Sequence, residues 1–320
     1  MMESPVEQVD RDQVVGFMDE KKIRAGETRE ANRYLDLIDR EHRGRWAGEA
    51  KIVAWGGPGG PVEREDVVSR EIRAVALKLG ADLVGITRTN QAYVYGGKHV
   101  PERFAISLGI EMDYDQVETA PGPGASTEGA RTYYELGKVT LRLAEHIRGL
   151  GYPAYAHHPL GLGRILQIPF ALAAGIGQMG KNGLVISKEY GPRIRLACVT
   201  TDLPLQASGP VDIGVDDFCA QCRACLKACP GGAIIGERRE IRGVEKFAID
   251  SARCWPHRVA TGGCSICIKV CALNRRTGWP TVTPGPKRKV ELELPGRPGP
   301  GNRAGPGDPI KRAEVSHDPI

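Results

Sequence analysis

Cys219-Ala-Gln-Cys222-Arg-Ala-Cys225-Leu-Lys-Ala-Cys229-Pro230 is the most informative stretch of this 320-residue chain. Its spacing, C-x2-C-x2-C-x3-C-P, is typical of the thiolate ligands of 4Fe–4S clusters. Four more cysteines follow at Cys254, Cys264, Cys267 and Cys271. Because each cubane cluster needs four thiolates, the eight cysteines predict two clusters and one-electron chemistry.

The order of the cysteines also predicts which of them share a cluster. In two-cluster ferredoxins the cysteine before proline ligates the other cluster. By that rule one ligand set is Cys219, Cys222, Cys225 and Cys271, and the other is Cys229, Cys254, Cys264 and Cys267. The second half departs from a plain ferredoxin, because Cys271 precedes Ala272 rather than proline. Two structural zinc sites are the alternative for the same cysteines, and Cys198 is expected to be a buried core thiol.

Composition narrows the class of protein further. Hydrophobic content of 41% and charge of 26% are ordinary for a globular protein. A net charge of +5 is small for this length, which disfavours nucleic-acid binding and suits an acidic donor protein or an anionic cofactor. We find no apolar run near the ~20 residues of a membrane span. The acidic, polar start Met1–Glu7 does not resemble an export signal. A reducing cytoplasm is therefore expected.

Four segments are predicted along the chain. Residues 1–61 form a poorly defined N-terminal extension. In 62–212 helical spacing alternates with short apolar strands, which predicts a layered α/β domain. Residues 213–278 hold the cysteines. Residues 279–320 are rich in Pro and Gly and have few apolar groups to offset the ordering entropy, which predicts a disordered tail.

Within the α/β segment the pattern predicts individual elements. Helices are expected at 67–79 and 128–150, and strands at 81–87 and 194–200. The stretch between 88 and 127 is expected to be rich in loops. Gly175-Ile-Gly177-Gln-Met-Gly180 has the spacing of a dinucleotide fingerprint, but a helix precedes it and a strand follows, which disfavours nicotinamide binding.

Three blocks before the cysteines carry a family resemblance. They are Gly177-Gln-Met-Gly180-Lys-Asn-Gly183, Tyr190-Gly-Pro-Arg-Ile-Arg-Leu196 and Thr201-Asp-Leu-Pro-Leu205. With the cysteine sets they resemble the cobalamin-dependent reductive dehalogenase family and, less closely, the epoxyqueuosine reductases. The likeness covers roughly residues 65–276. It implies an α+β fold, with a nitroreductase-like α/β corrinoid-binding domain followed by a ferredoxin-like domain that holds two 4Fe–4S clusters.

The resemblance also implies cofactor contacts. The corrinoid is expected base-off, and the sequence here lacks the Asp-x-His-x-x-Gly motif of a lower ligand. His157-His158-Pro159-Leu160-Gly161 is the nearest approach to that motif. The residues implied as cofactor contacts are Gly177, Gly180, Lys181, Asn182, Gly183 and His158.

The reaction implied is reductive dehalogenation of a small organohalide, with electrons from an external donor such as ferredoxin or flavodoxin. In the family a tyrosine donates the proton and a Lys or Arg stabilises its anion. Matched on the motifs, the acid is Tyr133, with Tyr134 as the adjacent alternative, and the cation is Lys181. A nearby cation lowers the pKa of a tyrosine from about 10.

Two other functions stay open. One is reduction of epoxyqueuosine in transfer RNA, whose enzymes use an aspartate acid in an Asp-Ser-x-Pro-like segment. The matching stretch here, Tyr155-Ala-His-His-Pro159, has no acid. The other is a non-catalytic module that carries corrinoid or relays electrons.

Overall fold

The computed structural model describes residues 29–43, 64–160, 163–241 and 244–276, all within one compact unit, Met1–Gly285. The predictions for the tail 279–320 and for most of the N-terminal extension fall outside the described residues. The boundary predicted between the α/β segment and the cysteine segment stays a prediction.

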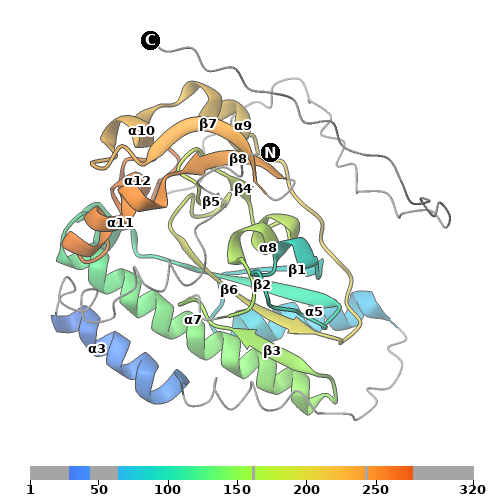
Figure 1. Cartoon of the computed structure of the whole chain (residues 1–320). Helices are drawn as coiled ribbons and strands as arrows, with labels where there is room; N and C mark the ends of the chain where they lie inside the picture. Colours follow the sequence, from blue (N-terminus) through green and yellow to red (C-terminus); the bar gives the residue numbers. More distant parts are fainter. Residues whose placement is uncertain (1–28, 44–63, 161–162, 242–243, 277–320) are drawn as a thin grey trace, which may run out of the picture. The chain divides into compact units, whose positions relative to one another are not determined.

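A four-stranded antiparallel sheet forms the centre of the described part (Figure 1). Its strands, in the order β1-β2-β6-β3, are Leu83–Arg88, Phe104–Glu111, Ile194–Thr201 and Ala154–His157. The inner strands β2 and β6 are buried along most of their length because helices cover both faces of the sheet. β2 lies in the stretch that the sequence pattern assigned to loops, and that prediction is wrong there.

Helices α5 (Glu65–Lys78) and α7 (Pro123–Gly149) pack on one face of the sheet. Ile106 and Leu108 of β2 point to that face, whereas Ala105, one position before Ile106, packs with Phe170 of α8 (Gln167–Ala173) on the other. This alternation is the period of two expected of a strand. α7 begins before the predicted start because a proline suits the first turn of a helix.

Shorter elements flank this core. α3 (Arg29–Ile38) lies along α7, and the π-helical turn η1 (Asp39–Arg43) follows it (Figure 1). The 3-10 turn η2 (Gln91–Tyr93) precedes β2, and α6 (Tyr114–Glu118) follows it.

The cysteine segment adds small helices and a hairpin. In chain order these are α9 (Val215–Gln221), α10 (Ala224–Ala228), β7 (Ile234–Ile241), β8 (Val244–Ile249), α11 (Ser251–Ala260) and α12 (Ile266–Lys269). The segment packs on the short hairpin of β4 (Gln178–Met179) and β5 (Val185–Ile186). Ile186, Val215 and Phe247 share one apolar cluster there. The predicted mixture of helices and strands is confirmed, and the nitroreductase-like description stays a prediction.

Candidate functional site

The eight predicted cluster ligands gather in two neighbouring groups. Burial, and then the nearby thiols of Cys219, Cys225 and Cys222, raise the pKa of Cys271 to about 12. Burial, and then the thiols of Cys229 and Cys264, raise the pKa of Cys254. The thiols that surround Cys271 are therefore those of its predicted ligand set.

Cys267 completes the second group. Burial raises the pKa of its thiol to about 12, and the neighbours that add to this are Cys254, Cys264, Cys225 and Cys229, in that order. Cys225 thus lies close to both groups. Thiols with such pKa values stay protonated at neutral pH unless a metal coordinates them, because coordination deprotonates a thiol outright. In the described part of the chain, no three His, Cys, Asp or Glu side chains are placed to hold a single metal ion.

Lys181 and Asn182, in the turn between β4 and β5, contact the cysteine segment. The Lys181 ammonium donates to the carbonyl oxygens of Cys222, at 2.9 Å, and of Ala220, at 3.4 Å. Its backbone N–H lies 3.5 Å from Cys219 Sγ. The Asn182 amide donates to the carbonyl oxygen of Cys267 at 3.3 Å. This turn therefore contacts the loops of both cysteine groups.

The glycines of the same block are needed for close packing. A Cβ on Gly177 would lie 2.1 Å from the carbonyl oxygen of Ile186, and one on Gly180 would lie 2.8 Å from an Ile186 side-chain atom. Gly183 has a φ of +73°, and a Cβ there would lie 2.5 Å from the Ile249 side chain. Gly177, Gly180 and Gly183, three of the predicted cofactor contacts, are thus packed closely against protein atoms.

His158, the remaining predicted cofactor contact, is engaged within the protein. It is 1% exposed, and its Nε2 lies 3.1 Å from Nδ1 of His42. Burial lowers the pKa of His158 to about 3, so the ring is neutral at physiological pH. Gly137 of α7 makes room for the pair, since a Cβ there would lie 2.2 Å from His158 Nε2.

The two candidate acids on α7 have different surroundings. The Tyr134 hydroxyl donates to Glu41 at 2.7 Å, and this bond raises the pKa of Tyr134 to about 12. His42 stacks on the Tyr134 ring at a centroid distance of 5.0 Å. A hydroxyl tied to a carboxylate in this way is a poor proton donor, which favours Tyr133 of the two.

Arg195 lies beside Tyr133, whereas the ammonium of Lys181, the predicted cation, contacts the cysteine segment. The Arg195 guanidinium carbon lies 5.0 Å from the centre of the Tyr133 ring. Gly129, one turn earlier on α7, leaves space for the guanidinium, because a Cβ there would lie 3.3 Å from it. Sequence reasoning missed Arg195, although it stands in the Tyr190–Leu196 block. Its place on the helix-facing side of β6, where Ala197 and Val199 also point to α7, was the available signal.

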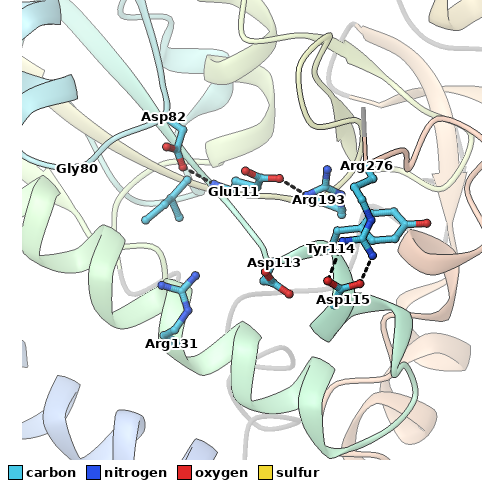
Figure 2. Close-up of a pocket in the computed structure, with 10 residues that line it drawn as sticks. Gly80, Asp82, Glu111, Asp113, Tyr114, Asp115, Arg131, Arg193 and Arg276 are labelled. Atoms are coloured by element: carbon cyan, nitrogen blue, oxygen red, sulfur yellow. Dashed lines mark hydrogen bonds and ion pairs between the residues drawn. The ribbon is translucent and has the colours of Figure 1, made fainter. Parts of the chain in front are cut away.

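A polar cavity of about 450 Å³ opens where β1 begins and β2 ends (Figure 2). Arg193 on its wall is 1% exposed and forms an ion pair with Glu111. It also donates to the carbonyl oxygens of Met112, at 2.8 Å, and Arg275, at 3.0 Å. Arg193 therefore ties the end of the cysteine segment to the end of β2.

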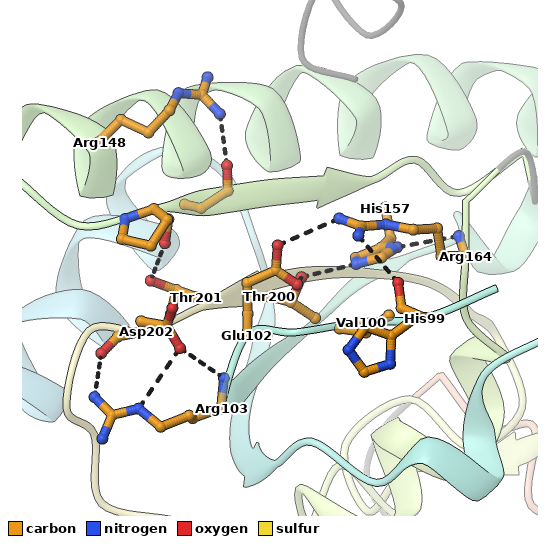
Figure 3. A network of polar contacts seen from close by, with 12 residues as sticks. His99, Val100, Glu102, Arg103, Arg148, His157, Arg164, Thr200, Thr201 and Asp202 are labelled. Carbon is orange, nitrogen blue, oxygen red and sulfur yellow. Dashed lines mark hydrogen bonds and ion pairs between the residues drawn. The ribbon is translucent and has the colours of Figure 1, made fainter. Parts of the chain in front are cut away.

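A second polar network fixes the loops beside β3 (Figure 3). Fully buried His157 bonds to the Thr200 hydroxyl at 2.9 Å, and that hydroxyl donates to Glu102 at 3.1 Å. Arg164 forms an ion pair with Glu102 at 3.3 Å. Burial holds the pKa of His157 well below its usual range, so the ring serves as a neutral link.

Comparisons with known proteins agree with this arrangement. A family model for the 4Fe-4S dicluster domain matches residues 218–275. The tetrachloroethene reductive dehalogenase of Desulfitobacterium hafniense is 35% identical over 183 residues, which are 53% of this chain and 33% of that protein. The epoxyqueuosine reductase of Lactococcus garvieae is 31% identical over 193 residues, which are 53% of this chain and 51% of that protein.

A solved structure similar to this chain is also a reductive dehalogenase. It is a reductive dehalogenase whose structure suggests a mechanism for B12-dependent dehalogenation, with 28% identity and a TM-score of 0.63. The match covers 72% of this chain and 36% of that one, so the chain spans about a third of these dehalogenases. None of the helices in the described ranges combines the length and hydrophobicity of a membrane span. The comparisons confirm the predicted resemblance to reductive dehalogenases, with epoxyqueuosine reductases as further relatives.

Proposed function

We propose that this chain is an oxidoreductase that removes halide from a small organohalide by reduction. The observation that carries the proposal is the gathering of eight thiols in two groups within the same compact unit in which Arg195 covers Tyr133. The reaction takes two electrons and one proton, and it replaces the carbon–halogen bond with a carbon–hydrogen bond as halide leaves. A relative named for tetrachloroethene supports the substrate class.

The thiols fit two 4Fe–4S clusters in their chemistry and in their grouping. The proposed ligand sets are Cys219, Cys222, Cys225 and Cys271 for one cluster, and Cys229, Cys254, Cys264 and Cys267 for the other. When bound, the clusters supply single electrons and a base-off corrinoid supplies the strongly reducing centre. The corrinoid is proposed from the similarity to the relatives alone. The residues between Gly177 and Gly183 that were predicted to contact it contact protein atoms.

Tyr133 is proposed to hold and deliver the proton. A guanidinium over a phenol favours its anionic form, because opposite charges attract and the ring face attracts cations. Arg195 is therefore proposed to make it easier for the Tyr133 hydroxyl to release its proton. Lys181 has no part in this step, since its ammonium is bonded to the cysteine segment.

An acidic one-electron donor such as ferredoxin or flavodoxin is the proposed partner. Residues 213–276 contain eleven Lys and Arg against six Asp and Glu, an excess equal to the net charge of the whole chain. Charge of one sign on a docking surface speeds the encounter with a partner of the other sign. Arg223 and Lys227, both exposed, stand within the first cysteine run.

Reduction of a transfer-RNA substrate is the second candidate, because an epoxyqueuosine reductase is among the relatives. The stretch Tyr155–Pro159 speaks against it, since it has no carboxylic acid and its His157 is buried in a neutral network. A non-catalytic electron carrier is the third candidate.

The test is anaerobic metal, sulfide and corrinoid analysis of the purified protein, followed by an assay of chloride release from tetrachloroethene. We expect about eight iron atoms per chain, bound corrinoid and chloride release that needs a reduced donor. Zinc in place of iron would refute the clusters. Iron without corrinoid binding or chloride release would refute the dehalogenase and leave the electron carrier.

A further inference from the structure

Lys181 carries a buried charge whose partner is not a carboxylate. Its side chain is almost fully enclosed, with the whole residue 6% exposed. The ammonium contacts the carbonyl oxygens of Ala220 and Cys222 and lies 5.7 Å from the centre of the Phe247 ring. Among the described residues no Asp or Glu lies within ion-pair distance of it, so these neutral dipoles alone hold the charge. Buried charges in proteins are normally matched by an opposite charge or a metal centre.

The closest candidate for that opposite charge is the first cysteine group. The carbonyl groups that accept from Lys181 belong to the run that begins at Cys219, and the Lys181 backbone N–H points to the Cys219 sulfur at 3.5 Å. A cluster with four thiolate ligands is an anion, and it gains one more negative charge on reduction.

We infer that Lys181 sets the reduction potential of the cluster held by Cys219, Cys222, Cys225 and Cys271. The inference rests on the proposed iron–sulfur function. A fixed positive charge stabilises the more negative, reduced form, so Lys181 raises that potential; net charge and hydrogen bonds to sulfur are the levers by which proteins tune such clusters.

The neighbouring residue makes the effect one-sided. Asn182 contacts the second cysteine group, at the Cys267 carbonyl oxygen, through a neutral amide. One turn of chain thus gives the first cluster a cation and the second cluster only a dipole. Removing the charge of Lys181 should therefore lower the potential of the first cluster and leave that of the second unchanged.

The experiment is a redox titration of the reconstituted protein, followed by electron paramagnetic resonance, for wild type, Lys181→Gln and Lys181→Arg. Lys188→Gln is the matched control, because Lys188 is an exposed lysine seven residues further along the same block. For Lys181→Gln we expect the reduction equilibrium of one cluster to fall about tenfold, ~59 mV for a one-electron couple. The other cluster of Lys181→Gln should keep its wild-type potential. In Lys181→Arg and Lys188→Gln both clusters should keep theirs.

The outcomes separate this inference from the function on which it rests. Wild-type protein that contains zinc in place of iron would refute the proposed clusters. Wild type and Lys181→Gln with about eight iron atoms each and identical potentials would refute the role of Lys181. Loss from Lys181→Gln of only the four iron atoms of one cluster would also overturn the inference, because Lys181 would then be needed to retain that cluster and not to set its potential. Loss of all iron from Lys181→Gln would overturn it, because Lys181 would then hold the whole segment together.

Discussion

Replacing Arg193 with methionine should destabilise this protein more than replacing any exposed arginine of the same cavity. The guanidinium is 1% exposed and bonds to the carbonyl oxygens of Met112 and Arg275. Methionine has a similar length but no donor, so both carbonyl oxygens lose their charged donor, and that of Met112 lies in a fully buried residue. A hydrogen bond from a charged donor contributes about 1.5–3 kcal/mol. The two together predict a loss of about 3–6 kcal/mol in the free energy of unfolding.

The ion pair with Glu111 adds little to this figure. The Glu111 side chain is 37% exposed, so water solvates its carboxylate once Arg193 is gone. Arg276→Met is the matched control, because Arg276 lines the same cavity, lies over the Tyr114 ring as Arg193 does, and pairs with Asp115. Both partners of that pair are 61% exposed, and exposed pairs contribute about 0–1 kcal/mol.

Urea unfolding followed by circular dichroism, at matched iron content, measures both losses. The reasoning requires that Arg193→Met lose at least about 2 kcal/mol more than Arg276→Met. Equal losses in the two variants would show that the burial of Arg193 does not add to the free energy of unfolding, which would refute this prediction.

Three further outcomes follow from the site. Tyr133→Phe should lower chloride release at least ~10²-fold while Tyr134→Phe retains it, and equal rates in the two would exclude Tyr133 as the acid. Because the folded pKa of His158 is about 3 and its ordinary value is 6.5, stability is full above pH 6.5 and falls as pH drops toward 3. His158→Asn should reduce the slope of the unfolding free energy against pH by about 1.4 kcal/mol per pH unit between pH 3 and 6.5. An unchanged slope would contradict this. Gly183→Ala should cost at least about 1–2 kcal/mol, from its φ of +73° and the Ile249 contact, and an unaltered melting temperature would speak against that packing.

The sequence allowed accurate prediction where the chemistry is local. The iron–sulfur segment could be recognised because its C-x2-C-x2-C-x3-C-P run is typical of 4Fe–4S ligands, and the dicluster domain model matches it. The division of the eight cysteines between two clusters stays a prediction. α5 and α7 were predictable because their apolar residues recur at helical spacing against one face of a sheet. β2 was missed because helices cover both of its faces, so its residues do not alternate between apolar and polar. The apolar run Phe104–Ile110 was the signal that could have revealed it.

The contact between Arg195 and Tyr133 could not be predicted from the sequence for a different reason. Lys181 and Arg195 stand in neighbouring blocks, and both are basic residues that suit the role of cation beside Tyr133. Which of them meets α7 depends on the register of β6 against β2, where Arg195 lies opposite Ile110, and on how α7 crosses that sheet. Contacts of this kind join residues more than sixty positions apart and are fixed only by the packed structure.

The short distance along the chain between Arg193 and Arg195 has a consequence for how this protein can change. One arginine holds the segment that follows Cys271, and the other covers Tyr133. Deleting or inserting one residue ahead of β6 would turn every following side chain to the opposite face of the sheet. Arg195 would leave α7, and Arg193 would lose its place between Glu111 and Arg275. The length of this block is therefore constrained by both ends at once.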